Sequence, residues 1–381
     1  MKVLQTIPSM LAAWGGPSTC TCDLLEGFYD IDAQVDLLTS GSSQKADLIL
    51  GQGRPWMKLV ENDWKTPLAF SSNFKKSLIN SAYDVYHVNT IWLYPSHVTC
   101  KIARQKHSPY VLSPHGMLYP TALKVSAWKK VPMKYLWFNK DIHKAACLHA
   151  TCEQEMIHIR EFGYKGPIAV IPNPVVFPEG VTIKEEVPKE NKIGYLGRLH
   201  PIKKVENLLY GAAEVLKKGS RPFKIEIMGK GAPDYEKFLH DEVERLGLSE
   251  IVNFVGFVSG IDKYNRLANL RALFVPSAQE NFGMIVPEAL ICGTPVYASL
   301  GTPWKELNEY QCGWWRDNDA SSIADVIRNV LNMQDSEILL MGAKGRKLME
   351  DKYEQHKVAQ MMIDLYKWIL QQGNKPAFVY E

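Results

Sequence analysis

The stretch that decides the fold is Ser277-Ala-Gln-Glu280-Asn-Phe-Gly283-Met-Ile-Val-Pro287-Glu288, which follows the apolar run 273–275. A buried strand leads here into a loop with one carboxylate, then a glycine, and then a helix with a second carboxylate. Pro287 fits that helix only in its first turn, where backbone N–H groups have no intrahelical partner. Such a helix start favours a bound anion. The stretch therefore predicts a strand–loop–helix unit of an α/β domain that binds an anionic ligand.

The spacing of the two acids excludes a common alternative. Glu280 and Glu288 are eight residues apart, or about 12 Å if the segment were all helical. The paired carboxylates of glycoside hydrolases lie about 5–9.5 Å apart. The two acids are better suited to binding hydroxyl groups at opposite ends of a diphosphate sugar. The alternative that remains open is a surface acid followed by an ordinary acid in a first helical turn.

A second strand end carries the opposite charge. The stretch Gly194-Tyr-Leu-Gly197-Arg198-Leu-His-Pro-Ile-Lys203-Lys204 places cations at an expected helix start, where they oppose the helix dipole. Local stability therefore does not explain them, whereas a bound phosphate does, because arginine offers a bidentate fork and lysine a point charge. The open alternative is a solvated basic loop.

Three further strand ends are rich in glycine. Gly229-Lys-Gly231 lets a nucleotide approach the backbone, but the dinucleotide pattern G-x-G-x-x-G fails because Asp234 stands where its last glycine belongs. This failure argues against an NAD dehydrogenase. In the first half, Gly15-Gly16 and His115-Gly116 also follow expected strands. A lone histidine is usually a packing residue, but its place at a strand end beside glycine favours a functional role.

Apolar runs alternate with amphipathic patterns along the chain, which is typical of parallel α/β domains. The expected strands are 2–7, 34–38, 85–88, 110–112, 147–150 and 168–171, and then 192–196, 223–228, 251–255, 271–275 and 295–297. The expected helices are 96–105, 133–144, 204–218, 234–246, 284–292, 321–331, 337–350 and 355–371. The segment between them, from 171 to 188, is rich in proline and suits neither helix nor sheet.

These patterns predict two doubly wound Rossmann-like domains facing each other across a cleft. Their expected bounds are 1–175 and 191–354, joined by a linker at 176–190, with a last helix in 355–381 that crosses back to the first domain. In such sheets ligands collect at the carboxyl ends of the strands.

Bulk composition limits the class of protein. The 381 residues carry a formal net charge of only +3, so the molecule as a whole is no nucleic-acid binder. No apolar run approaches the ~20 residues that span a bilayer, and the start of the chain lacks the features of a signal peptide. The seven cysteines are scattered without zinc-site spacing, so we expect free thiols, no metal site and a cytoplasmic protein.

Taken in order, these landmarks resemble the family 4 retaining glycosyltransferases, the group 1 glycosyl transferases of GT-B fold. The matching residues are Gly15-Gly16, His115-Gly116, Ile171-Pro-Asn-Pro, Gly197-Arg198 with Lys203, Gly229 and Gly231, and Glu280 and Glu288 followed by Ala-Leu-x-Cys-Gly-Thr-Pro-Val. The last pattern is highly specific, and the resemblance covers nearly the whole chain. It implies a hexosyltransferase that retains the anomeric configuration, uses a UDP- or GDP-sugar as co-substrate, and needs neither a metal nor another cofactor.

The resemblance also implies a role for each matched residue. Arg198 and Lys203 would hold the diphosphate, Glu280 the donor sugar and Glu288 the ribose, while His115 would contact the sugar near the reacting carbon. The remaining donor-site residues would be Gly15, Gly16, Gly197, Gly229, Gly231, Phe257, Val258, Asn281, Phe282, Gly283 and Met284. The family usually has glycine after the lysine, where this chain has Lys204. Either lysine could reach the phosphate, and the spacing favours Lys203.

The resemblance extends to a subgroup that builds bacterial surface polysaccharides such as capsule and lipopolysaccharide. It is carried by Gly301-Thr-Pro-Trp304-Lys-Glu-Leu and Gly313-Trp-Trp315, and it implies a glycan or polyprenyl-diphosphate-linked acceptor bound by the first domain. A sugar-nucleotide epimerase or hydrolase of the same fold remains the alternative.

One segment of the first domain is locally basic. Residues 116–140 contain five lysines and no acidic residue, with aromatic residues between them. We predict peripheral binding to the inner leaflet of the cytoplasmic membrane, since each lysine near an anionic leaflet contributes ~1 kcal/mol and interfacial aromatics anchor a segment. The residues expected to contact membrane or acceptor are Lys124, Trp128, Lys129, Lys130 and Lys134. The alternative is a solvated face whose aromatic residues pack inward.

Overall fold

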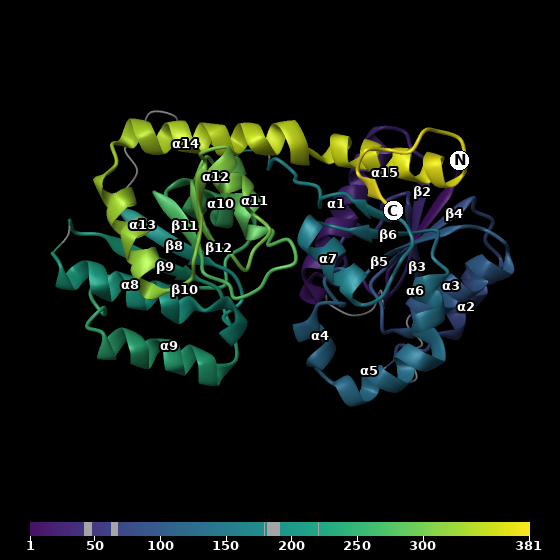
Figure 1. Cartoon of the computed structure of the whole chain (residues 1–381), viewed down its shortest axis with the longest axis horizontal. Helices are drawn as coiled ribbons and strands as arrows, with labels where there is room; N and C mark the ends of the chain where they lie inside the picture. Colours follow the sequence, from purple (N-terminus) through teal and green to yellow (C-terminus); the bar gives the residue numbers. More distant parts are fainter. Residues whose placement is uncertain (42–47, 62–67, 179, 181–190, 220) are drawn as a thin grey trace. The chain divides into compact units, whose positions relative to one another are not determined.

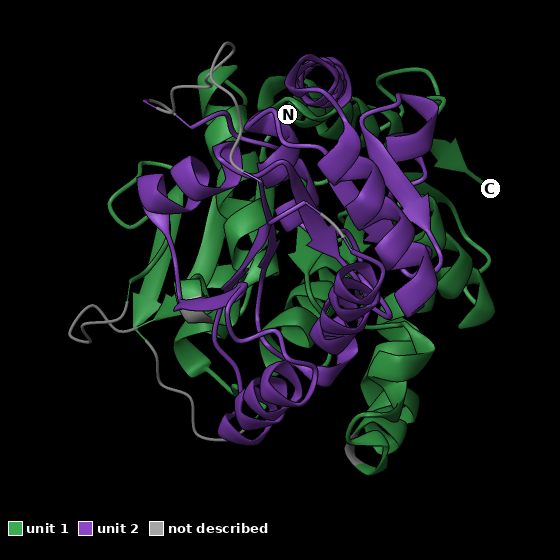
Figure 2. Cartoon of the chain, turned by 90° about the vertical axis from the view of Figure 1, so that its left-hand side faces the viewer, with its two compact units in different colours: residues 1–174, 353–381 green, residues 175–352 purple. Residues whose placement is uncertain are grey.

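The computed structural model describes residues 1–41, 48–61, 68–178, 180, 191–219 and 221–381. These residues divide into two compact units, coloured separately in Figure 2. Unit 1 comprises Met1–Pro174 and Tyr353–Glu381, and unit 2 comprises Val175–Lys352. Most of the linker expected at 176–190 lies outside the described residues.

Unit 1 is built on a sheet with the order β14-β7-β6-β5-β4-β1-β2-β3 (Figure 1). Neighbouring strands run parallel except β14, which is antiparallel to β7. The order reverses between β1 and β4, so the carboxyl ends of these strands form a topological switch point. The strands are β1 (Val3–Thr6), β2 (Val35–Gly41), β3 (Met57–Glu61), β4 (Val85–Asn89), β5 (Tyr110–Ser113), β6 (Cys147–Ala150), β7 (Ile168–Val170) and β14 (Val379–Tyr380).

Helices cover both faces of this sheet, which explains why β4 is buried along its whole length. The helices are α1 (Gly16–Asp30), α2 (Ser72–Ile79), α3 (Tyr94–Gln105), α4 (Pro120–Lys124), α5 (Ala127–Met133), α6 (Asn139–His143), α7 (Glu153–Glu161) and α15 (Gln355–Ile369), with short turns η1 (Ala12–Trp14) and η2 (Lys134–Phe138). The C-terminal helix α15 packs on α1 and buries Val358, Met362 and Leu365 against the sheet. The Gln355 amide also donates to the Asp23 carbonyl over 2.5 Å.

Unit 2 repeats the same winding with six parallel strands in the order β10-β9-β8-β11-β12-β13. Its switch point lies between β8 and β11. The strands are β8 (Lys192–Leu196), β9 (Lys224–Met228), β10 (Val252–Gly256), β11 (Ala272–Val275), β12 (Val296–Ser299) and β13 (Gly313–Arg316). The helices are η3 (Pro201–Lys203), α8 (Val205–Lys217), α9 (Pro233–Arg245), α10 (Gly260–Ala268), α11 (Ile285–Ile291), α12 (Glu306–Glu309), α13 (Ala320–Asn332), α14 (Asp335–Leu348) and η4 (Met349–Tyr353).

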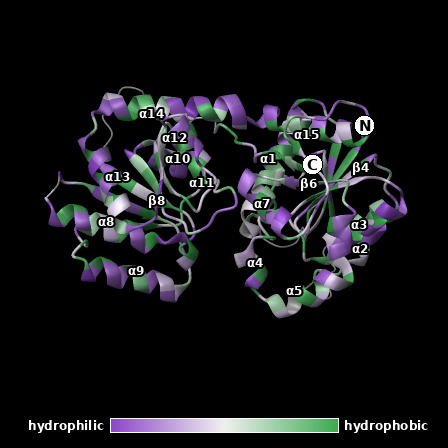
Figure 3. Cartoon of the chain, in the orientation of Figure 1, coloured by the Kyte–Doolittle hydropathy of each residue, from purple (hydrophilic) through white to green (hydrophobic). Residues whose placement is uncertain are grey.

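The strands expected from apolar runs are all present, with ends shifted by at most three residues. Hydrophobic residues gather on these strands, and hydrophilic ones on the outer helices, such as α9 (Figure 3). The edge strands β3, β13 and β14 were not predicted, because each is short and partly exposed and carries no long apolar run.

The helix expected at 133–144 is present but irregular, because the helical stretch already begins at Ala127 and contains a π-helical turn. The chain forms α5, the π-helical turn η2 and then α6 in place of one regular helix. Pro132 lies inside α5 and lacks the N–H that a regular helix needs there. The backbone hydrogen bonds are rearranged just after it, as at other π-bulges.

Two expectations from the composition, on the cysteines and on membrane-spanning helices, can be compared with the structure. All seven cysteines are free thiols, as expected, and burial raises the pKa of several of them, including Cys147, to about 12. Among the described helices, none is both long enough and apolar enough to cross a membrane.

Candidate active site

The switch point of unit 2 brings the two charged motifs together. The loop after β8 carries Arg198 and Lys203, and the loop after β11 carries Glu280. A backbone hydrogen bond of 2.7 Å from Ala278 N to the Ile202 carbonyl joins the two loops directly. Residues some 80 positions apart in the sequence therefore share one edge of the sheet.

Lys203 and Glu280 are in contact at this edge. The Lys203 ammonium lies 2.5 Å from Glu280 Oε1, and the two side chains are 19% and 10% exposed. The Ser277 hydroxyl donates to the same oxygen over 2.7 Å. This arrangement fixes the direction of the carboxylate and keeps a cation beside it, which suits a ligand that presents both hydroxyl groups and negative charge.

Arg198 is the available cation of the cluster. Arg198 is exposed, and its guanidinium has no hydrogen-bond or ion-pair partner among the described residues. The backbone is nevertheless held, because the Tyr195 hydroxyl donates to the Arg198 carbonyl over 3.0 Å. A positioned loop thus carries a guanidinium whose donors are open to an external anion.

The neighbouring Lys204 faces a different partner. Its ammonium lies 3.6 Å from Glu206 Oε1, whereas Lys203 faces Glu280. Lys204 also has a φ of +52°, in the left-handed region that favours glycine. This conformation fits the glycine that the family resemblance leads us to expect at this position.

Glu288 lies in the first turn of α11 and is paired with a residue that the sequence analysis missed. Lys263 of α10 places its ammonium 2.9 Å from Glu288 Oε1. Burial acts to lower the pKa of Lys263, but Glu288 and Tyr264 together outweigh it and raise that pKa above its ordinary value. Only the position of Lys263 near the start of an amphipathic helix could have indicated this partner.

The glycines after β9 are required by the fold itself. A Cβ atom on Gly229 would lie 1.9 Å from the Gly197 carbonyl oxygen, and one on Gly231 would lie 2.0 Å from the Leu199 carbonyl oxygen. The two strand ends therefore touch backbone to backbone. Close chain packing explains these residues without any ligand.

The loop 280–284 is fixed from behind by the tryptophan of the Gly301-Thr-Pro-Trp304 stretch. The buried Trp304 indole donates to the Phe282 carbonyl over 2.6 Å, and the Glu280 N–H donates to the Gly301 carbonyl over 2.9 Å. Asn281, Gly283 and Met284 complete this loop before α11. Phe257 and Val258 follow β10, and the Phe257 side chain is 73% exposed.

In unit 1, His115 and Gly116 form a tight turn after β5. Both have positive φ, +52° and +76°. The His115 Nε2 lies 3.0 Å from Asn89 Oδ1 at the end of β4. The Gly116 N–H donates over 2.5 Å to Glu155, a buried residue of α7 whose other carboxylate oxygen accepts from Thr151. Asn89 and Glu155, which hold this turn, were not predicted.

Gly15 and Gly16 lie at the start of α1, after β1. Gly15 has a φ of +81°, which accounts for its glycine. At Gly16, φ is not in the left-handed region and an added Cβ meets nothing within 4 Å. Among the described residues, the fold therefore gives no reason for glycine at position 16.

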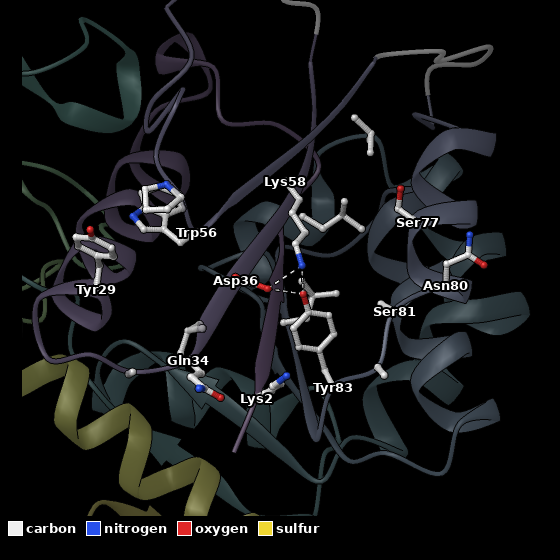
Figure 4. A pocket seen from close by; sticks show the side chains of 17 residues that line it. Lys2, Tyr29, Gln34, Asp36, Trp56, Lys58, Ser77, Asn80, Ser81 and Tyr83 are labelled. Atoms are coloured by element: carbon white, nitrogen blue, oxygen red, sulfur yellow. Dashed lines mark hydrogen bonds and ion pairs between the residues drawn. The ribbon is translucent and has the colours of Figure 1, made fainter.

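A cavity of about 690 Å³ in unit 1 lies apart from these residues. It is lined near the amino ends of β1, β2 and β3, where Asp36 receives hydrogen bonds from Lys58 and Tyr83 (Figure 4). The predicted residues of unit 1 lie at the opposite ends of the strands. None of them lines this cavity.

Two of the predicted lysines of the basic segment have partners within unit 1, and the side chain of Lys129 lies outside the described residues. The Lys130 ammonium donates to the Ala122 carbonyl over 2.6 Å, and Lys134 lies 4.3 Å from the centre of the Phe162 ring, so both lysines are engaged within unit 1. Burial lowers the pKa of Lys130. Lys124 is exposed. The large exposed side chains of this segment are Val125, Trp128, Val131, Tyr135 and Leu136.

Comparison with solved structures shows the fold. HepE (Alr3699) of Anabaena, solved with UDP and glucose, superposes with a TM-score of 0.76 at 20% identity and covers 97% of this chain and 100% of that chain. The sucrose-phosphate synthase of Thermosynechococcus elongatus gives a TM-score of 0.76 at 18% identity, with 97% and 100% coverage. The predicted GT-B class, with two parallel-sheet domains, is confirmed.

Curated relatives match shorter regions. An uncharacterized glycosyltransferase, MJ1607, of Methanocaldococcus jannaschii is 29% identical over 181 residues, which is 47% of this chain and 45% of the relative. A D-inositol 3-phosphate glycosyltransferase of Mycobacterium sp. (strain KMS) is 39% identical over 119 residues, 29% of this chain and 25% of the relative. The matched region thus spans less than half the length of either relative.

Family models account for most of the sequence. The model of the glycosyl transferase 4-like domain matches residues 15–174, which lie in unit 1, and that of the glycosyl transferases group 1 matches residues 180–347, which lie in unit 2. Together the two matches span most of the chain, which thus carries a glycosyl transferase 4-like domain followed by a glycosyl transferases group 1 domain.

Proposed function

We propose that this protein is a retaining, metal-independent hexosyltransferase. It transfers a sugar from a UDP- or GDP-sugar to a glycan or a lipid-linked acceptor in surface-polysaccharide synthesis. Glu288 binds the ribose, Glu280 and the loop 281–284 bind the donor sugar, and His115 contacts the sugar from unit 1.

The observation that carries this proposal is the cluster at the switch point of unit 2. Glu280 is held by Lys203 and Ser277, while Arg198 is exposed without a partner in the described chain. A ligand with hydroxyl groups at one end and a diphosphate nearby can donate hydrogen bonds to Glu280 and accept them from Arg198. The HepE structures solved with UDP, with UDP-glucose, and with UDP and glucose support a donor of this kind.

The chemistry follows from where charge develops. As the glycosidic bond to the donor breaks, negative charge grows on the leaving diphosphate, and Arg198 and Lys203 stabilise it. Retention means that the acceptor attacks the face from which the diphosphate leaves. The protein supplies position and charge in this scheme, without a covalent nucleophile.

The proposal is tested by nuclear magnetic resonance on the purified protein incubated with a panel of UDP- and GDP-hexoses. Without acceptor, we expect only slow hydrolysis of one donor. With a polyprenyl-diphosphate-linked sugar, we expect faster nucleotide release and a product with the anomeric configuration of the donor. Complete conversion of the donor to its epimer without acceptor would instead identify an epimerase.

We predict that EDTA leaves the activity essentially unchanged. Protein side chains, Arg198 and Lys203, supply the positive charge that a metal ion supplies in other transferases. Turnover measured with EDTA, and again after adding manganese or magnesium, checks this. An absolute requirement for either metal would contradict the role of the two cations.

We propose that the segment 124–136 binds the cytoplasmic face of an anionic membrane, with the exposed apolar residues as the anchor. We expect the triple variant Trp128→Ser, Tyr135→Ser, Leu136→Ser to lower binding to phosphatidylglycerol vesicles roughly 10-fold or more. Leu340→Ser on α14, which is 59% exposed, is the matched control and should leave binding unchanged. Equal vesicle binding by the triple variant and the wild type would disprove this anchor.

A further inference from the structure

Unit 1 contains a buried polar layer that its apolar core does not explain. On the sheet face covered by α15, the strands change from apolar to polar toward their carboxyl ends. Val3 is followed by Gln5 on β1, Val85 by His87 on β4, and Cys147 by His149 on β6. Six polar residues of this layer are less than 5% exposed: Gln5, His87, Asn89, Ser113, His149 and Tyr366. Such a layer is stable only if every member is hydrogen-bonded.

The layer is a chain of hydrogen bonds whose direction is fixed at one end. His149 Nε2 lies 2.8 Å from the Ile171 carbonyl, which can only accept, so Nε2 carries the proton. Burial lowers the pKa of His149 to about 4, so the ring is neutral and its Nδ1 accepts from the Ser113 hydroxyl at 2.7 Å. The Ser113 oxygen must then accept from His87 Nε2 at 2.6 Å.

The donor and acceptor of each following hydrogen bond, including those of Tyr366 on the C-terminal helix α15, are assigned in the same way. Burial also lowers the pKa of His87 well below its usual value, so its Nδ1 accepts from the Tyr366 hydroxyl at 2.6 Å. The Tyr366 oxygen accepts from Gln5 Nε2 at 3.2 Å, and Gln5 Oε1 accepts from Asn89 Nδ2 at 3.0 Å. Asn89 Oδ1 therefore faces His115 Nε2, at 3.0 Å, as an acceptor.

We propose that this relay positions His115. It holds the imidazole as the neutral Nε2–H tautomer, so that Nδ1 is a hydrogen-bond acceptor for a hydroxyl group of the bound sugar. Tyr366, on α15, is then a positioning residue that acts through Gln5 and Asn89. The inference rests on the proposed function, because it takes His115 as part of the sugar site.

Two observations support His115 Nδ1 as the hydrogen-bond acceptor for a bound sugar. Among the described residues, Nδ1 of His115 has no hydrogen-bond partner, and the residue is partly exposed. The turn that carries the ring is held independently by Glu155 through the Gly116 N–H. Backbone and side chain of His115 are thus fixed from two different elements.

The first test is nuclear magnetic resonance of the free protein with ¹⁵N-labelled histidine, with His115→Ala to assign the signal. We expect His115 as a single Nε2–H tautomer in the wild type. Tyr366→Phe should convert it to a mixture of tautomers. Tyr164→Phe, which removes another buried hydroxyl of unit 1 bonded to the Ala145 carbonyl, should not. An Nδ1–H tautomer in the wild type, or an unchanged signal in Tyr366→Phe, overturns the proposal.

The second test asks whether Tyr366 acts through His115. We expect Tyr366→Phe to lower kcat roughly 10- to 100-fold with little change in nucleotide affinity. In the His115→Ala background the same change should have no further effect. An equal loss in both backgrounds would show a role independent of His115. The tautomer measurement needs no turnover, so a protein with the expected tautomer but no transfer activity would refute the proposed function alone.

Discussion

We expect Arg198→Ala and Lys203→Ala each to lower turnover roughly 10- to 1000-fold. A charge-assisted contact to a phosphate contributes ~1.5–3 kcal/mol. A contact that strengthens as the diphosphate leaves also lowers kcat, with ~4 kcal/mol as the upper limit found for a lost oxyanion donor. Donor-saturation kinetics on the purified variants measure the effect. The melting temperature of Arg198→Ala should stay close to the wild type because Arg198 is exposed, whereas that of Lys203→Ala reports the loss of its pair with Glu280.

Lys204→Ala is the matched control for this prediction. Its side chain faces Glu206. Alanine must adopt the same φ of +52° that lysine adopts here, so the substitution adds no new backbone strain. We therefore expect its turnover to stay within about threefold of the wild type, since it loses an ion pair of 3.6 Å that lies apart from Glu280. A silent Lys203 together with a critical Lys204 would shift the phosphate site by one residue.

The second large effect is expected at Gly229 and Gly231, which pack against backbone, in contrast to Gly16, which does not. Gly229→Ala and Gly231→Ala should each destabilise the protein by ~3–5 kcal/mol or prevent its folding, because a Cβ there meets a backbone carbonyl within 2.0 Å. Gly16→Ala should leave the melting temperature nearly unchanged, because its Cβ meets no atom. It should nevertheless weaken donor binding, since the methyl group would occupy space beside the backbone where the family resemblance places the donor. Thermal unfolding and donor KM separate the two kinds.

The contrary results are equally clear. A stable Gly229→Ala would show that the β8 and β9 loops can separate, and that its glycine serves a ligand after all. A Gly16→Ala variant with normal stability and normal KM would remove Gly16 from the proposed donor site.

The fold was predictable from local signals. Both sheets have the 3-2-1-4-5-6 order at their centre, which follows from apolar runs alternating with helices and from right-handed crossovers. Arg198, Lys203 and Glu280 were predictable as a group, because strand ends on either side of a switch point meet at one edge. The edge strand β3 was not predictable, because partial exposure removes the apolar run on which strand prediction depends.

The partners that hold the site were beyond sequence reasoning. Lys263 reaches Glu288 from a different helix, and Glu155 reaches Gly116 across 39 positions. Tyr366 is 361 positions from Gln5, and the amphipathic pattern of its helix shows only that it faces inward. Pairings of this kind depend on side-chain geometry in three dimensions, which residue types and spacing do not specify.

The measurement that tests the central claim most directly is calorimetric titration of UDP and GDP into the wild type and Arg198→Ala. We predict that one of the two nucleotides binds the wild type with one site per chain. Arg198→Ala should weaken that binding roughly 10- to 150-fold, which corresponds to one lost charge-assisted contact. Failure of both nucleotides to bind the wild type, or equal binding by the wild type and Arg198→Ala, would contradict a nucleotide-sugar site at the switch point of unit 2.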